Sequence, residues 1–413
     1  GHVNPALAVA RALLDRGHEA AMLTASSYRS AVEAAGVLFF PPRLASDRDF
    51  NHLGEVLPDL RRLPNAEVVD RLFVDLPVAE AAVQGNDVAV AAKHWSAGVL
   101  VNDGITLGVP LAAGLFGLPW ATVSPFIFCT WPVSGQPPPF WGLPRRDGHA
   151  GLLTARAGWQ LSRLRAASAT HRWSSLARAW HAERRVSSAR VAGCSPLLYL
   201  YPGGPALESP GATLPRCVQG VGPLVHEPAL GEHAAPVGQR RIFVTEGMTH
   251  TGSGLLTLAV EAMQGWRGEL LVAGGSIRSE QLQGVGPPHV RVVGHVRYSE
   301  ALAGASLLIT NGGAGSLLAA LQAGVPSLIL PAGLDKAEAA GRVAATGAGV
   351  RLPPAHRCTP RSLRATAEHV MSSPSYRERA VEVGRSLLAL GGATRAAALL
   401  EDLAVTQSCA DKS

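Results

Sequence analysis

One segment of the chain constrains the fold more than any other. Residues 308–343 read LITNGGAGSLLAALQAGVPSLILPAGLDKAEAAGRV. An apolar run ends at Asn311, two glycines follow, and then come a helical pattern, a second apolar run and an Asp-Lys pair. Glycines between a strand and a helix let backbone N–H groups approach a phosphate, and the helix N-terminus adds partial positive charge. The segment predicts an anion site; a glycine turn needed only for packing is the alternative.

The same alternation of strand and helix recurs along the chain and predicts parallel α/β sheets. Strands are expected at 20–23, 37–40, 98–102, 241–245, 269–273, 290–293, 307–310 and 327–330. The helices expected in the second half lie near 316–322, 337–345, 360–371, 375–390 and 393–404. A polar, aperiodic stretch around 227–239 interrupts the pattern and predicts a linker.

The fold class expected from this pattern is therefore α/β, with two doubly wound, Rossmann-like domains. The predicted parts are an N-terminal domain at 1–225, a linker at 226–240 and a second domain at 241–392. Residues 393–413 form a C-terminal helix, which can pack back on the N-terminal domain, and a tail.

Composition excludes several classes of protein. The net charge is +6, but no basic run is interleaved with aromatic residues, so no nucleic-acid partner is expected. The apolar stretch around 97–128 is broken by Asn102, Asp103, Pro110 and Pro119, which argues against a membrane-spanning helix. The five cysteines lie far apart without a C-x-x-C motif, as expected for reduced thiols in a cytoplasmic protein rather than metal ligands. Nothing in the pattern predicts the oligomeric state.

The glycine segment also excludes two nucleotide-binding classes. It is not a G-x-G-x-x-G motif after a first strand, and no Walker A lysine follows it. A dinucleotide oxidoreductase or a P-loop ATPase is therefore disfavoured.

A loop rich in proline and aromatic residues, FIFCTWPVSGQPPPFW, lies at 126–141. Loops of this kind form lids or pocket walls over a sheet edge. Trp131, Phe140 and Trp141 are the residues expected to contact an apolar ligand there; ordinary packing of amphipathic aromatics is the alternative.

The order of motifs resembles glycosyltransferase family 1. GHVNPALAVARALLDRGHEA at the start, LVNDGITLGVPLAA in the middle and the 308–343 segment resemble the N-terminal, central and donor-binding signatures of that family, in its order and spacing. The resemblance implies the GT-B architecture, with an N-terminal acceptor domain, a C-terminal nucleotide-sugar domain and an active cleft between them.

The resemblance also implies roles for individual residues. His2 matches the catalytic base, and Asp103 matches the acid that orients it. The departing diphosphate would lie on Gly312, Gly313, Gly315 and Ser316, where backbone dipoles replace a metal ion. No cofactor or metal is therefore expected, and the Asp47-x-Asp49 pattern is interpreted as chance.

Several positions depart from the common family pattern. Asn311 stands where a phosphate-contacting His is usual, and Asp335-Lys336 replaces Asp-Gln. Arg297-Tyr298 replaces Pro-Gln near the base, and Ala319 replaces a ribose-binding acid. A bacterial subgroup resembles these residues better, so they indicate a variant donor site in which Lys336 reaches the diphosphate or the sugar.

The family has a strand and a glycine-rich turn before G-H-V-N-P, whereas this chain begins at Gly1. The resemblance thus predicts a truncated chain that lacks the first strand and leaves His2 poorly supported. The expected function is that of a cytoplasmic, metal-independent, inverting glycosyltransferase of the hexosyltransferase type, moving a sugar from a UDP- or dTDP-sugar to a hydroxyl of an apolar natural product. The alternative is a catalytically impaired homologue that only binds nucleotide sugars.

Overall fold

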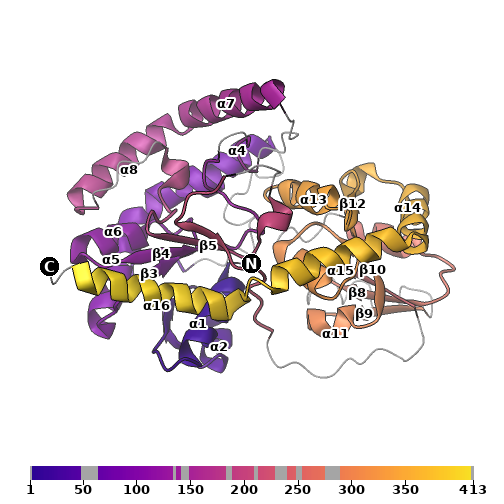
Figure 1. Ribbon diagram of the computed structural model, residues 1–413, viewed down its shortest axis with the longest axis horizontal. Coiled ribbons are helices and arrows are strands. Elements are labelled where there is room, and N and C mark those ends of the chain that lie inside the picture. Colours follow the sequence, from indigo (N-terminus) through magenta and orange to yellow (C-terminus); the bar gives the residue numbers. More distant parts are fainter. Residues whose placement is uncertain are drawn as a thin grey trace. The chain divides into compact units, whose positions relative to one another are not determined.

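The structure is a computed structural model of the whole chain. It describes residues 2–47, 64–133, 136–140, 148–182, 188–208, 213–227, 240–247, 254–274 and 289–410. These residues divide into two compact units (Figure 1). The first unit contains the described residues from His2 to His226 and from Leu390 onward, and the second contains those from Glu227 to Ala389.

The second unit is built on a six-stranded parallel sheet with the order β12-β11-β10-β7-β8-β9. Its strands are β7 (Arg241–Thr245), β8 (Glu269–Ala273), β9 (Val290–Val293), β10 (Ala305–Thr310), β11 (Ser327–Ile329) and β12 (Gly349–Arg351). The order reverses where β7 lies beside β10, which is the topological switch point of a doubly wound sheet. The expected doubly wound fold of this half is therefore confirmed.

Alternating residues of β7 point to two separate cores, one on each face of this sheet. Ile242 and Val244 pack in one core, and Phe243 packs in the other. The helices of the unit are α9 (Leu255–Ala262), α11 (Tyr298–Leu302), α12 (Ala314–Gln322), α13 (Lys336–Ala345), α14 (Pro360–Ser372) and α15 (Pro374–Leu388), together with the 3₁₀ turn η7 (Ala355–Arg357). A strand that is buried on both faces carries apolar residues on both faces, and each face packs in its own core. Burial of the sheet therefore explains both the long apolar runs in the sequence and the presence of two cores.

The first unit contains two parallel sheets. Four strands pair in the order β3-β4-β5-β6, namely β3 (Leu100–Asn102), β4 (Trp120–Val123), β5 (Leu198–Tyr201) and β6 (Val218–Gly220). A separate pair consists of β1 (Ala21–Leu23) and β2 (Leu38–Phe40). The strands expected near 20–23, 37–40 and 98–102 are therefore present, and the first two form a sheet of their own.

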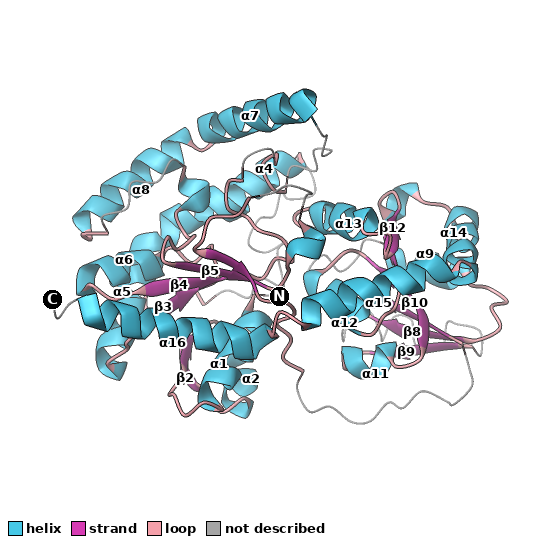
Figure 2. Cartoon of the chain, in the orientation of Figure 1, coloured by secondary structure: helices cyan, strands magenta, loops and turns pink. Residues whose placement is uncertain are grey.

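Helices surround these strands (Figure 2). They are α1 (Val3–Leu14), α2 (Arg29–Ala34), α4 (Asn65–Asp70), the π-helical turn η4 (Arg71–Asp75), α5 (Leu76–Trp95), α6 (Gly108–Phe116), α7 (Gly148–Arg165), α8 (Ala167–Ala179) and α16 (Gly392–Ala410). Short 3₁₀ turns are η1 (Ser26–Tyr28), η5 (Ala189–Val191) and η6 (Pro205–Leu207). Within the described residues, no helix is both long enough and apolar enough to cross a membrane.

The last helix of the chain, α16, lies beside the first helix, α1 (Figure 1). Ala8 and Val9 of α1 share a buried core with Ala396 and Leu400 of α16. The carboxylate of Glu401 also pairs with His18 at 2.6 Å and with Arg16. The C-terminal helix thus belongs to the first unit, although it follows the second unit in the sequence.

Candidate active site

Two residues that lie 101 positions apart in the sequence form a hydrogen-bonded pair in the first unit. His2 immediately precedes α1, and Asp103 immediately follows strand β3. His2 Nδ1 lies 2.7 Å from Asp103 Oδ2, and their side chains are 33% and 20% exposed. His2, which the resemblance expected to be poorly supported, is thus held by an acidic partner in a half-buried position.

The turn after β3 determines which oxygen of Asp103 faces the histidine. Asp103 Oδ1 accepts hydrogen bonds from Ile105 N at 3.1 Å, Thr106 N at 2.8 Å and Thr106 Oγ1 at 2.8 Å. Burial raises the pKa of Asp103, but the hydrogen bonds and charge of His2 and the bonds from Thr106 outweigh it and lower that pKa to about 2. Asp103 is therefore ionised at neutral pH, with Oδ2 directed at the imidazole.

An aromatic cluster borders the histidine. Phe126 meets the His2 ring edge-on, with centroids 5.7 Å apart and planes at 88°. Phe140 lies 4.9 Å from Phe126, and Phe73 stacks on Phe140 at 4.9 Å. Phe128 lies 5.7 Å from Phe126 and completes the group, which we call the phenylalanine cluster (Phe73, Phe126, Phe128 and Phe140). A buried apolar cluster thus adjoins the candidate base, since Phe126, Phe128 and Phe140 are 6%, 0% and 7% exposed.

Two members of the phenylalanine cluster have unusual backbones. Phe140 has a φ of +71°, which is costly for a side chain with a Cβ, and Phe73 lies in the π-helical turn η4. Both features are typical of functional sites. Sequence reasoning identified Phe140 but missed Phe73, Phe126 and Phe128; the alternation of Phe126 and Phe128 just after β4 is the signal that would have found the latter two.

The two tryptophans expected at this site have different outcomes. Trp131 packs edge-on against Tyr199, with ring centroids 6.2 Å apart, in a core that contains Cys129 and Cys194. Trp141 lies outside the described residues. The ring of Phe140 lies 4.9 Å from that of Phe126, which itself meets His2.

The second unit places three of the predicted residues, Asn311, Asp335 and Lys336, after the carboxyl ends of parallel strands, together with Glu246, which was not predicted. Glu246 follows β7, Asn311 follows β10, and Asp335 and Lys336 follow β11. Gly313 caps α12, and the first helical N–H to be paired is that of Leu317, which donates to Gly313 O at 3.1 Å. The earlier N–H groups of the helix are oriented as an anion-binding helix N-terminus requires.

Gly312 occupies a position that no other residue fits without strain. Its φ is +94°, and a Cβ there would lie 3.1 Å from the carbonyl oxygen of Lys336 and 3.2 Å from Ile329. A Cβ on Gly315 would lie 3.6 Å from the ring of Tyr298. Gly312 therefore permits a close approach of the loop to Lys336, whereas a Cβ at position 315 would make only an ordinary van der Waals contact with Tyr298.

Ser316 and Asn311 are already engaged within the protein. Ser316 Oγ donates to Gly313 O at 2.9 Å and lies 2.9 Å from Thr310 Oγ1. Asn311 is fully buried, and its amide nitrogen donates to the carbonyl oxygen of Glu246. Asn311 Oδ1 has no hydrogen-bond partner among the described residues. The asparagine thus joins the ends of β10 and β7.

Lys336 is a buried cation beside two carboxylates. Its side chain is almost fully covered, at 3% exposure, and its backbone follows a turn in which Leu334 has a φ of +53°. Burial lowers the pKa of Lys336, while the nearby charges of Asp335 and Glu246 raise it. Glu246 Oε1 also accepts a hydrogen bond from Leu255 N at 3.1 Å, at the start of α9. Sequence reasoning missed Glu246, whose position directly after a buried strand was the available signal.

Tyr298 begins helix α11 and lies next to the same loop. Burial raises the pKa of its hydroxyl, a hydrogen bond with Thr245 lowers it, and the charge of Glu227 raises it. Its ring centroid lies 6.0 Å from that of Phe243. The hydroxyl is therefore neutral at physiological pH and able to donate a hydrogen bond.

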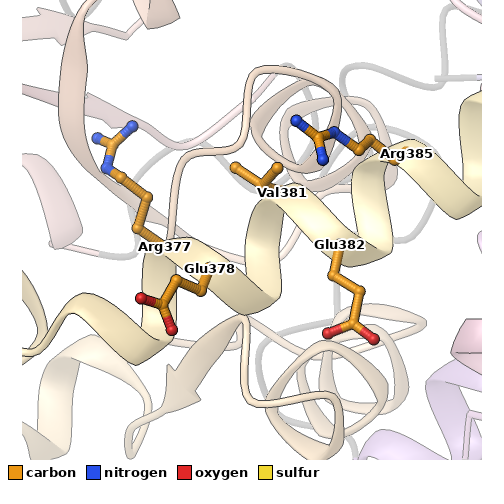
Figure 3. A pocket seen from close by; sticks show the side chains of 5 residues that line it. All are labelled: Arg377, Glu378, Val381, Glu382 and Arg385. Carbon is orange, nitrogen blue, oxygen red and sulfur yellow. The ribbon is translucent and has the colours of Figure 1, made fainter.

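Two other features carry no comparable chemistry. A depression on α15 is lined by Arg377, Glu378, Val381, Glu382 and Arg385 (Figure 3). Its lining side chains all come from α15 and include none of the predicted site residues. Asp47 Oδ1 accepts a hydrogen bond from Ser26 N at 2.8 Å, whereas Asp49 lies outside the described residues. The part of the chain that the structure describes contains no group of three metal-ligating side chains.

Comparison with known proteins supplies the class. Residues 260–403 match the family model described as "Erythromycin biosynthesis protein CIII-like, C-terminal domain". The chain is 28% identical over 417 residues to 4'-demethylrebeccamycin synthase of Lentzea aerocolonigenes, covering 98% of this chain and 97% of that protein. The crystal structure of the glycotransferase of kitacinnamycin superposes with a TM-score of 0.75 at 21% identity, covering 97% and 95% of the two chains. The glycosyltransferase VinC, solved in complex with dTDP, gives a TM-score of 0.67 at 19% identity, covering 98% and 97%.

The fold shared with these structures is GT-B, which confirms the fold class expected from the sequence. The chain is a glycosyltransferase related to the enzymes of macrolide and other antibiotic biosynthesis. Assignment to a variant subgroup remains a prediction.

Proposed function

We propose that the chain transfers a sugar from a dTDP- or UDP-sugar to a hydroxyl of an apolar small molecule, with inversion at the anomeric carbon. The observation that carries this proposal is the His2–Asp103 pair, bordered by the phenylalanine cluster. Transfer to a hydroxyl of an aromatic or polyketide acceptor requires a base that takes the hydroxyl proton, an ionised partner that stabilises the protonated base, and apolar side chains next to the acceptor scaffold. The intact pair favours an enzyme over a binding protein without activity.

The proposed proton transfer uses the nitrogen of His2 that Asp103 does not contact. Asp103 Oδ2 accepts the Nδ1–H of His2, so the lone pair of Nε2 is available for the acceptor proton. As the proton moves to Nε2, the imidazole gains a positive charge, which the ionised Asp103 stabilises. The deprotonated oxygen forms its bond to the anomeric carbon from the side opposite the diphosphate, and the bond to the departing diphosphate breaks.

The proposed donor site lies in the second unit. The diphosphate would accept hydrogen bonds from the N–H groups around Gly313 and Gly315 at the start of α12, and the Lys336 cation would offset its charge. Tyr298 would contact the donor beside Gly315, and Asp335 would bind sugar hydroxyls. Two structural neighbours, VinC and SsfS6, were solved with thymidine diphosphate, which supports a thymidine or uridine diphosphate donor. Metal independence and a cytoplasmic location remain predictions.

The test separates donor binding from turnover. Thermal unfolding of the chain is followed with dTDP, UDP, GDP and NAD, and transfer is followed by mass spectrometry with dTDP- and UDP-glucose and a panel of phenolic and polyketide acceptors. We expect stabilisation by dTDP or UDP alone, by about 2.7 kcal/mol at a hundredfold excess over Kd.

The His2→Ala variant should keep that stabilisation and lose turnover. A variant that retains turnover would refute the role of His2. A chain that responds to none of the nucleotides would refute the donor site.

A further inference from the structure

Helix α7 has its apolar side chains on the outside. The residues that it buries are small, and they are Gly151, Ala155, Gly158 and Ser162. Three leucines lie outside this buried strip: Leu153, Leu161 and Leu164 are 65%, 51% and 72% exposed. At about 100° per residue these leucines fall within roughly 80° of one another. Leu153 and Leu164 lie opposite the buried residues and Leu161 lies to one side of them, while Leu152, which is 41% exposed, lies on the other side. A surface helix of a globular protein normally shows the reverse arrangement.

The charges around this leucine row all have one sign. The described segment 148–182, which spans α7 and α8, contains five arginines and no aspartate or glutamate. Arg165 pairs with Asp70, and Arg172 pairs with Asp75. Arg156 and Arg163 flank the leucine row on α7, are exposed, and form no ion pair with any residue that the structure describes.

We infer that the outer face of α7, defined by Leu153, Leu161, Leu164, Arg156 and Arg163, adsorbs to an anionic membrane surface. The leucines would enter the boundary between headgroups and acyl chains, and the arginines would remain among the lipid phosphates. The helix spans 18 residues, or about 27 Å, so it can lie along a flat surface. This inference is independent of the proposed glycosyl transfer.

The composition of the face argues for lipid rather than protein as the partner. Protein interfaces concentrate their binding energy in tryptophan, tyrosine and arginine, and leucine is under-represented there. The outer face of α7 offers leucine and arginine without an aromatic anchor. An anionic membrane has negatively charged headgroups at its surface and apolar acyl chains beneath them. Leucines next to positively charged arginines complement both layers.

The test is co-sedimentation of the full chain with vesicles of phosphatidylglycerol and phosphatidylcholine in equal parts, compared with vesicles of phosphatidylcholine alone. We expect binding to the anionic vesicles that weakens as salt is added. The triple variant Leu153→Gln, Leu161→Gln, Leu164→Gln should bind at least tenfold more weakly. Because the three side chains are exposed, the variant is expected to fold normally. The double variant Arg156→Gln, Arg163→Gln should lose about fivefold per arginine and most of the salt dependence.

The matched control is Leu388→Gln, which replaces a leucine of α15 that is 49% exposed. It should bind the anionic vesicles as the unmodified chain does. Absence of binding to anionic vesicles would overturn the inference, as would equal loss in the control and the triple variant. Self-association in the ultracentrifuge that the triple variant abolishes, without vesicle binding, would identify the face as a contact between two copies and would also overturn it.

Discussion

The replacement of Asp103 by asparagine tests the candidate active site on two independent quantities. The substitution keeps the shape of the side chain and an oxygen that can accept the bonds from Thr106, but it removes the negative charge that faces His2. The pKa of Asp103 falls from 3.8 to about 2 in the folded protein. Each pKa unit corresponds to about 1.4 kcal/mol, so the ionised carboxylate stabilises the fold by roughly 2 kcal/mol.

The sign of the pH dependence follows from the lowered pKa. A carboxylate whose folded pKa lies below its unfolded value contributes its full stability above about pH 4, and the contribution disappears as the pH falls towards 2. Asp103→Asn should therefore lower the free energy of unfolding by roughly 2 kcal/mol at pH 7, and the difference should narrow at pH 3. Urea denaturation at both pH values measures this difference.

The same variant should lower kcat by about 10²- to 10⁴-fold, because the base loses both its orientation and the charge that stabilises its protonated form. The matched control is Asp15→Asn, which removes the partner of Arg11 on the surface of α1, where the aspartate side chain is 58% exposed. The control should change stability by less than about 0.5 kcal/mol and leave kcat unaltered. A kcat for Asp103→Asn within twofold of the unmodified enzyme would refute the reasoning.

Two further predictions concern the second unit, and a third concerns metal independence. Gly312→Ala should lower the free energy of unfolding by about 1–3 kcal/mol and weaken dTDP or UDP binding, because the φ of Gly312 is +94° and the new Cβ would lie 3.1 Å from Lys336 O. Urea denaturation measures the stability and titration calorimetry measures the affinity. Unchanged values of both would contradict the loop geometry. Lys336→Met should lower donor affinity at least tenfold and destabilise the fold by about 3 kcal/mol, since two carboxylates lose their cation. The double variant Lys336→Met, Glu246→Gln should recover stability but not donor affinity. Recovery of both would exclude a contact between Lys336 and the diphosphate. A millimolar excess of EDTA should leave the rate of transfer unchanged, whereas a loss restored by a divalent cation would refute metal independence.

Local sequence patterns predicted much of the second unit. The expected ranges of β7, β8 and β9 coincide with the observed strands. Strands β7 and β8 are buried along their whole length, so the sequence shows them as apolar runs, whereas the edge strand β9 is half-buried and carries Arg291 among its valines. Helix α12 begins two residues earlier than expected, at Ala314, because glycine and alanine after the turn still adopt helical geometry. The linker expected at 227–239 lies almost entirely outside the described residues.

The side-chain partners at the site could not be derived from local patterns. Asn311 reads as a ligand contact in the sequence, yet its amide binds the carbonyl of Glu246, 65 residues earlier. In the sequence Phe73 looks like an ordinary helical residue. In the structure it lies in the π-helical turn η4, and its ring stacks on that of Phe140. Such pairings depend on how the whole chain folds, because no periodicity in either segment specifies the distance between them.

The packing of α16 on α1 has a consequence for how the protein is made. The core shared by Val9 and Leu400 joins residues nearly four hundred positions apart, so the first unit completes this core only after the second unit has been synthesised. Until α16 has been synthesised, the part of α1 that packs against it stays uncovered, although Ala8 and Val9 can already pack on β4 and β5. The emerging chain is then exposed to aggregation, and a protein that ended after α15 would remain permanently in this immature state.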